Sequence, residues 1–172
     1  SLLGLQPGDR VLDFGAGCGL GAVWLAEAFG AVVTVVDAFA EHLAGAEAHA
    51  ARAGVTLGAV CRGDVAALEA FADGSFDAVF TNSALQVSQP LAVQCAVLRA
   101  HFVRLLRPGG VLWWGDLNNP FHRPTHRSTE AQWSSCLGLL AAEGLVAAAW
   151  VPELAAFGAT EVFSAHSRSL LA

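Results

Sequence analysis

The chain has 172 residues, of which 55% are hydrophobic, and a formal charge of −6 at pH 7. This length suits one domain, with a core that buries about 70% of the surface exposed by the unfolded chain. No apolar run reaches the ~20 residues that a membrane-spanning helix needs. The negative charge and the lack of a basic run argue against nucleic acid and anionic membrane surfaces as partners. Small or neutral substrates fit this composition better.

The residue types narrow the chemistry further. The chain contains no lysine, which excludes a lysine nucleophile or Schiff base. Its four cysteines lie far apart and form no Cys-x-x-Cys pair, so we predict neither a metal site nor a redox motif. No signal peptide is visible, although the chain starts at Ser1 and not at methionine, and we expect a cytoplasmic location.

Short apolar runs alternate with helical patterns through the first half of the chain. In order, we expect a strand over 11–14, a helix over 20–29, a strand over 31–36, a helix over 39–52, a weaker strand over 55–61, a short helix over 65–71 and a strand over 76–81. A glycine-rich stretch joins the first strand to the first helix.

The second half continues the alternation. A long helix begins at Ser88 or Gln89, with Pro90 in its first turn, where a missing backbone donor costs little. Its apolar positions 91, 95, 98, 102 and 105 are spaced by four and three, as one buried helix face requires. A turn over 107–110 leads to a strand over 111–115. A helix from 129 to 144 and two final strands, 145–151 and 160–166, complete the chain.

This alternation predicts an α/β fold with a parallel sheet covered by helices on both faces, a three-layer αβα sandwich. In such sheets ligands bind outside the carboxyl ends of the strands. Polar residues follow each of the first five strands here. They are Asp13, Asp37, Asp64, Asn82 with Ser83, and Asp116 with Asn118.

Five motifs at these places together resemble the class I methyltransferases that use S-adenosylmethionine. A glycine pattern alone would also fit the GxGxxA of dinucleotide-binding folds, but the combination is more specific. The motifs are Leu12-Asp13-Phe14-Gly15-Ala16-Gly17-Cys18-Gly19, then Asp37, Gly63-Asp64-Val65, Phe76-Asp77-Ala78-Val79 and Leu106-Arg107-Pro108-Gly109-Gly110. The resemblance spans 6–166 and implies one domain over 1–172 with a seven-stranded, mostly parallel sheet whose last strand is antiparallel.

The resemblance also implies where the cofactor, S-adenosylmethionine, and its product S-adenosylhomocysteine bind. Asp13 would interact with the cofactor's ammonium, directly or through water, beside a loop that lets the backbone approach the ligand. Asp37 stands 18 positions after Gly19 (37 minus 19), close to the spacing of an acid that accepts ribose hydroxyls. Asp64 would accept from the adenine amino group. The remaining expected cofactor residues are Gly15, Ala16, Gly17, Gly19, Ala38, Phe39, Gly63, Val65 and Asn82.

The acceptor side is less defined. The sequence after the fourth strand lacks the Asn-Pro-Pro-aromatic or Asp-Pro-Pro-aromatic signature of enzymes that methylate amino groups of nucleic acids and glutamine, which argues against those acceptors. The pattern that follows, Ala84-Leu85-Gln86-Val87 and a long helix leading into Arg-Pro-Gly-Gly, is more similar to methyltransferases that act on O, N or C of small molecules. Methyl transfer needs a general base only where the acceptor proton is hard to lose. His122 or His126 would be that base for a hydroxyl acceptor, and solvated loop histidines are the alternative. The expected acceptor-contacting residues are Ser83, Gln86, Asp116 and Asn118.

Other polar residues are given structural or solvent-facing interpretations. Asp77 is expected to be structural, Arg107 to be a solvated residue at a helix end, and His42, His49 and His101 to be exposed on helices away from the strand ends.

Three functions remain open. The first is a small-molecule methyltransferase, the second a methyltransferase-like scaffold that has lost catalysis, and the third a nicotinamide-dependent oxidoreductase, which leaves Asp13 and the Pro108-Gly109-Gly110 turn without a role. Members of the family commonly carry N-terminal helices that cover the cofactor, and here only about ten residues precede the first strand. The alternatives are a fragment, an open site, or cover supplied by a second copy or a partner chain.

Overall fold

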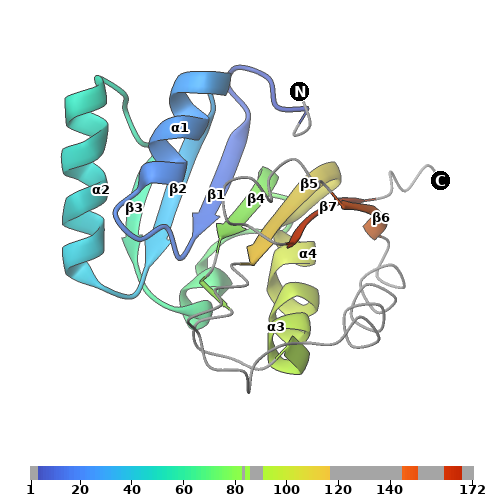
Figure 1. Cartoon of the computed structure of the whole chain (residues 1–172). Coiled ribbons are helices and arrows are strands. Elements are labelled where there is room, and N and C mark those ends of the chain that lie inside the picture. The colour runs from blue at the N-terminus through green and yellow to red at the C-terminus, as the bar shows by residue number, and fades with distance from the viewer. Residues whose placement is uncertain (1–3, 83, 86–90, 117–144, 151–160, 168–172) are drawn as a thin grey trace.

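The computed structural model describes residues 4–82, 84–85, 91–116, 145–150 and 161–167. They form a seven-stranded sheet in the order β3-β2-β1-β4-β5-β7-β6, with helices packed against it (Figure 1). The strands are β1 (Arg10–Phe14), β2 (Val32–Asp37), β3 (Ala59–Arg62), β4 (Phe76–Asn82), β5 (Leu106–Asp116), β6 (Leu145–Trp150) and β7 (Glu161–Ser167). The first five strands are parallel, and β7 is antiparallel to both of its neighbours. The predicted fold class and the antiparallel last strand are confirmed.

Two hydrophobic clusters, one on each face of the sheet, define the three layers. On one face α1 (Leu20–Phe29) and α2 (Ala40–Ala53) contribute Leu25 and Leu43 to a cluster with Val33 and Val35 of β2. The other face is covered by η1, a 3-10 helix (Val65–Ala70), and by α3 (Leu91–Val97), the π-helical turn η2 (Leu98–Phe102) and α4 (Val103–Leu105). The alternation of side chains along each buried strand sends neighbouring residues to opposite faces. The sheet therefore has an apolar surface on both faces, and helices cover each of them, as in the predicted three-layer sandwich.

The long helix predicted before the fifth strand is helical from Leu91 to Leu105, but not regularly α. Its middle five residues, Leu98–Phe102, form a π-helical turn. Leu98, Phe102 and Leu105 are fully buried, as their spacing predicts. The phase shift of the π turn therefore leaves the apolar face of the helix intact.

The expected turn over 107–110 is instead an excursion within β5. Phe76 pairs with Leu106, and Ala78 pairs with Val111. Between these two pairs, β4 advances from residue 76 to 78 while β5 advances from 106 to 111, so β5 has extra residues there. Gly109 has a φ of 79°, and a Cβ on Gly110 would lie 2.9 Å from the carbonyl oxygen of Asp77. Glycines are needed here because the bulge in β5 requires a positive φ at Gly109 and leaves no room for a side chain at Gly110 beside β4.

The third strand is shorter than predicted, four residues over 59–62 instead of seven over 55–61. Gly54, in the left-handed conformation, ends α2, and pairing with β2 begins only at Ala59. The helix expected over 129–144 lies outside the described residues. Within the described part of the chain, every helix is too short or too polar to cross a lipid bilayer.

Candidate functional site

The candidate site lies at the carboxyl ends of β1, β2 and β3, which are neighbours in the sheet (Figure 1). The loop after β1, residues 15–19, is called the glycine loop below. It is tied to β2 by the Gly15 N–H, which donates to the carbonyl of Val36 at 2.8 Å. The loop after β3 is tied to the same strand, since the Gly63 N–H donates to the carbonyl of Asp37 at 2.9 Å. Three stretches that are distant in sequence thus meet at the end of β2.

Asp37 lies at the centre of this junction and is only 6% exposed. Its Oδ2 accepts the backbone N–H of Gly17 at 2.8 Å, and its Oδ1 accepts that of Phe39 at 2.9 Å. The Nδ1 of His42 lies 3.0 Å from the same Oδ1. Because an ionised carboxylate only accepts hydrogen bonds, this nitrogen carries the proton and donates. The predicted ribose acid therefore also holds the glycine loop in place.

The glycine loop is shaped by packing as much as by ligand access. Gly15, Gly17 and Gly19 all have positive φ, between 54° and 74°. A Cβ on Gly15 would lie 2.0 Å from the Cβ of Ala84, and a Cβ on Gly19 would lie 2.5 Å from the Cβ of Ala46. A Cβ on Gly17 would meet nothing within 4 Å. Of the three glycines expected to make room for a ligand, only Gly17 faces open space. Gly15 and Gly19 instead make room for the side chains of neighbouring alanines.

Asp13 is buried beneath the start of α1, with 2% of the residue exposed. Its carboxyl accepts the backbone N–H of Ala22, while its Oδ2 has no hydrogen-bond partner among the described residues. A Cβ on Gly21 would lie 3.3 Å from that oxygen. Burial, reinforced by the negative charge of Asp37, raises the pKa of Asp13 from 3.8 to about 7.

The residues expected around the adenine ring are partly engaged within the protein. Asp64 is exposed, and its Oδ1 accepts the N–H of Ala66 at 2.9 Å, which caps η1. Ala38 is exposed and its carbonyl lies 3.4 Å from the Nε of Arg62. Phe39 is 60% exposed. Large exposed aromatic surface at a strand end is available for stacking against a ring.

One face of α2 packs onto the glycine loop, and the sequence analysis missed it. His42, Ala46 and His49 are spaced by four and three, so they lie on the same side of the helix. They contact Asp37, Gly19 and Cys18 in turn, and the Nδ1 of His49 lies 2.7 Å from the carbonyl oxygen of Cys18.

The expectation of three exposed histidines away from the strand ends is wrong. His42, His49 and His101 are all partly buried, and the first two touch the candidate site. The signal that could have shown this is the same spacing of four and three, together with the start of α2 only three residues after Asp37.

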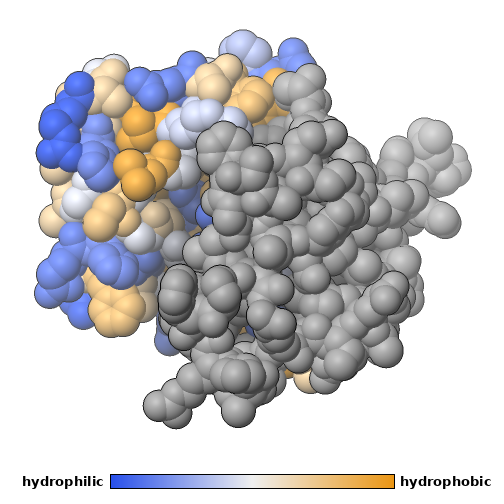
Figure 2. All heavy atoms as spheres, viewed as in Figure 1, coloured by the Kyte–Doolittle hydropathy of each residue, from blue (hydrophilic) through white to orange (hydrophobic). Residues whose placement is uncertain are grey.

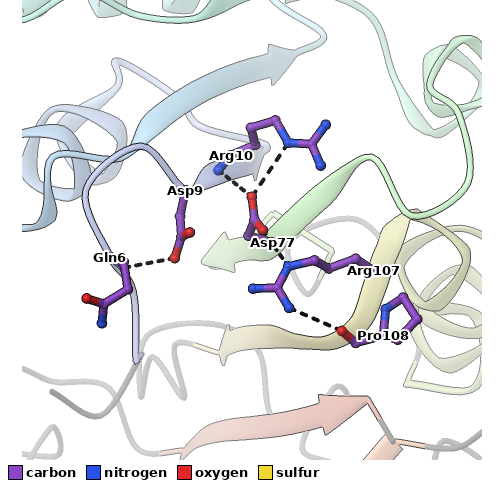
Figure 3. A network of polar contacts seen from close by, with 6 residues as sticks. All are labelled: Gln6, Asp9, Arg10, Asp77, Arg107 and Pro108. Carbon is purple, nitrogen blue, oxygen red and sulfur yellow. Dashed lines mark hydrogen bonds and ion pairs between the residues drawn. The ribbon is translucent and has the colours of Figure 1, made fainter. Parts of the chain in front are cut away.

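A separate polar network lies at the opposite, amino-terminal edge of the sheet (Figure 3). Asp77 accepts the backbone N–H of Arg10 at 2.7 Å and forms an ion pair with Arg107. Burial alone would raise the pKa of Asp77, but the hydrogen bonds and charges of Arg107 and Arg10 hold it below 3.8. The structural interpretation of Asp77 is confirmed. Arg107 is not a solvated helix end, because it lies in β5 and pairs with this carboxylate.

Two residues expected near the methyl acceptor, Asn82 and Asp116, fall within the described ranges. Asn82 is the last residue of β4, exposed and paired in register with Gly115. Asp116 ends β5 opposite Glu161. The other expected acceptor and catalytic residues, Ser83, Gln86, Asn118, His122 and His126, lie outside the described residues. Within the described ranges, no three His, Cys, Asp or Glu side chains are grouped as a metal site requires.

Comparison with known proteins decides the family. The family model described as a methyltransferase domain matches residues 11–110, which hold every described element of the candidate site. This chain belongs to the class I S-adenosylmethionine-dependent methyltransferases.

Two relatives and one solved structure show how far the likeness extends. An uncharacterised methyltransferase of Synechocystis is 34% identical over 118 residues, which are 69% of this chain and 51% of the relative. The botryococcene C-methyltransferase of Botryococcus braunii is 34% identical over 131 residues, 73% of this chain and 33% of the relative. The chain therefore spans about half of the first relative and about a third of the second.

The solved structure is phosphoethanolamine N-methyltransferase 2 of Haemonchus contortus, in complex with phosphomonomethylethanolamine and S-adenosylhomocysteine. Its TM-score to this chain is 0.69 at 20% sequence identity, and the aligned region covers 97% of this chain and 51% of the Haemonchus chain. At this identity the likeness shows the shared methyltransferase fold.

The described residues of this methyltransferase domain fit an S-adenosyl group. The group carries a cationic ammonium and a ribose diol, which need negative or acceptor atoms. The buried Asp13 Oδ2 lacks a hydrogen-bond donor among the described residues, and the Asp37 carboxylate stands at the end of β2. A Cβ on Gly17, in the loop that Asp37 holds, would meet no atom within 4 Å.

Proposed function

We propose that this domain binds S-adenosylmethionine at the carboxyl ends of β1, β2 and β3 and transfers its methyl group to a small-molecule acceptor. The observation that carries the proposal is the Asp37 carboxylate, whose Oδ2 accepts the Gly17 N–H at 2.8 Å. This bond holds the acid for the ribose against the loop that would receive the methionine arm. The S-adenosylhomocysteine in the Haemonchus structure and the family of the chain support the choice of ligand.

The chain's own residues bind and orient the cofactor. Asp37 would accept ribose hydroxyls, Gly17 would leave room for the ligand, and the negative charge of Asp13 would attract the ammonium directly or through water. When bound, the cofactor's sulfonium supplies an electrophilic methyl group. A net charge of −6 suits a cationic ligand.

The acceptor is proposed to be a small molecule and not a nucleic acid. The strand-end sequence Thr81-Asn82-Ser83-Ala84 lacks the motif of enzymes that methylate amino groups of nucleic acids. The name of the botryococcene C-methyltransferase supports carbon among the acceptor atoms to be tried. Ser83, Gln86, Asp116 and Asn118 are the proposed acceptor contacts, with His122 or His126 as base for a hydroxyl.

Calorimetry tests the cofactor part of this proposal. S-adenosylmethionine and S-adenosylhomocysteine should bind the wild-type protein, and NAD should not. Asp37→Ala should weaken binding by about 1 to 3 kcal/mol through loss of charge-assisted hydrogen bonds. Glu27→Ala, which removes an exposed carboxylate from α1, is the matched control and should bind as the wild type does. Failure of the first two ligands to bind at millimolar concentration would overturn the proposal.

Turnover tests the transfer itself. Pooled small molecules with hydroxyl, amine and carbon nucleophiles are incubated with cofactor labelled in its methyl group. A labelled product whose yield falls with Asp37→Ala, at a cofactor concentration near the wild-type Kd, is the expected result. Tight cofactor binding without any labelled product from a broad acceptor pool would favour the non-catalytic scaffold instead.

A further inference from the structure

The hydrogen bonds of Asp37 leave little room for a ribose diol. Its Oδ1 already accepts two donors, the Phe39 N–H at 2.9 Å and the His42 Nδ1 at 3.0 Å, and its Oδ2 accepts one, the Gly17 N–H. An ionised carboxylate has about two acceptor sites on each oxygen. One site therefore remains, on Oδ2, whereas a diol bound to both oxygens needs a site on each.

The three donors differ in how easily they can withdraw. The Gly17 and Phe39 donors are backbone groups, held by the glycine loop and by the residue that precedes α2. His42 donates from a side chain that is 43% exposed and can rotate about χ1. Its ring also meets the Phe39 ring edge to face, with centroids 5.1 Å apart. His42 is thus the donor that can leave without moving the backbone.

We propose that His42 occupies the acceptor site on Asp37 that a ribose hydroxyl takes, so that the imidazole must leave when the cofactor binds. This inference rests on the proposed function, since it concerns the same ribose acid. His42 then sets the affinity for ligands that carry a ribose diol: its bond to Asp37 stabilises the cofactor-free site and opposes diol binding. Two substitutions separate this competition from a supporting role.

The first substitution is His42→Phe, which keeps a ring against Phe39 and removes the donor. The second is His42→Asn, whose side-chain N–H₂ stands at the same number of bonds from Cα as Nδ1 and keeps the donor. Glu47→Ala, an exposed position on the same helix, is the control. Thermal melts of each variant check that it folds.

Calorimetry with S-adenosylhomocysteine and with its 2′,3′-dideoxy analogue gives the readout. Binding of S-adenosylhomocysteine should tighten about three- to tenfold in His42→Phe, the equivalent of one net hydrogen bond, and stay near the wild-type value in His42→Asn. The analogue has no diol, so its affinity should be the same for wild type and His42→Phe.

Other outcomes overturn the inference in distinguishable ways. Weaker or unchanged binding of S-adenosylhomocysteine by His42→Phe would show that His42 supports Asp37 or is indifferent to it. Equal tightening for the dideoxy analogue would show an effect unrelated to the diol. A wild-type protein that binds neither S-adenosyl compound would remove the proposed function itself, and the His42 inference with it.

Discussion

Asp13 and Asp37 are two carboxylates at the same edge of the sheet that differ in their number of hydrogen-bond donors. Asp37 has three hydrogen-bond donors, whereas Asp13 has one backbone donor and an oxygen without a partner among the described residues. Burial with few hydrogen-bond donors favours the neutral form of the Asp13 carboxyl. A pKa of about 7 leaves Asp13 partly protonated at neutral pH when no cation is beside it.

The raised pKa of Asp13 predicts a pH-dependent free energy of unfolding. The folded state prefers the protonated carboxyl, whose pKa is 3.8 in an unfolded chain and about 7 here. The stabilisation is fully present below pH 3.8 and is lost as pH rises through about 7. Asp13→Asn, which stays neutral, should therefore gain about 2 to 4 kcal/mol relative to the wild type between pH 4 and pH 8.

Urea denaturation of the cofactor-free protein at pH 4, 5, 6, 7 and 8 measures this difference. Comparing the two proteins at each pH cancels the titration of all other groups. A constant difference between them across this range would mean that Asp13 is ionised throughout.

At the scale of elements, the glycine loop leads from β1 into α1 and packs against α2. Gly19 brings the loop so close to α2 that a Cβ would lie 2.8 Å from the Cα of Ala46. His49 adds a side-chain contact to the carbonyl of Cys18 on the same face. The loop conformation therefore depends on how α2 packs, and α2 in turn begins at Ala40, three residues after Asp37.

Alanine at Gly17 and at Gly19 should have different consequences for stability. Gly17→Ala adds only the strain of a positive φ, about 1 to 2 kcal/mol of unfolding free energy, because its Cβ meets open space. Gly19→Ala adds the same strain and a clash with the backbone of α2, for a total loss of about 2 to 5 kcal/mol.

Urea unfolding of both variants, alongside the wild type, checks the order. Gly17→Ala should weaken S-adenosylhomocysteine binding although it is the better folded of the two, because its methyl group enters the open space. Equal losses of stability would contradict the packing role of Gly19.

At the scale of the whole molecule, strand pairing and burial are greatest in the centre of the sheet. β1 is paired on both sides, by β2 and β4, and four of its five residues are buried. Among the described strands, β3 is paired on one side only, by β2, and none of its four residues is fully buried. In the region of α1 and α2, apolar residues are scattered among hydrophilic ones (Figure 2). Leu20 and Trp24 of α1 are 70% and 49% exposed.

Hydrogen exchange followed by mass spectrometry should reproduce this gradient. Peptides that cover 10–14 should exchange most slowly, over the timescale of global unfolding, and peptides that cover 59–62 should exchange faster through local opening. Addition of S-adenosylhomocysteine should slow exchange in the loops after β1 and β3. Equal rates for the two strands in the free protein would contradict the predicted gradient.

The sequence by itself determined the fold class and the carboxylates at the strand ends. Alternating strands and helices leave few topologies, and a polar residue directly after a buried strand must lie at the sheet's edge. The strands over 11–14 and 76–81, the helix over 20–29 and the placement of Asp37 were predictable for this reason. Cofactor roles drawn from the resemblance stay predictions at the level of single contacts.

Only the tertiary structure decided how these residues are engaged. The bond from His42 to Asp37, the contact of Gly19 with Ala46, and the burial that raises the pKa of Asp13 all depend on how α1 and α2 pack on the sheet. Packing distances are set by many side chains at once, so no local pattern encodes them. The same holds for Arg107, whose partner Asp77 lies 30 residues earlier in the chain.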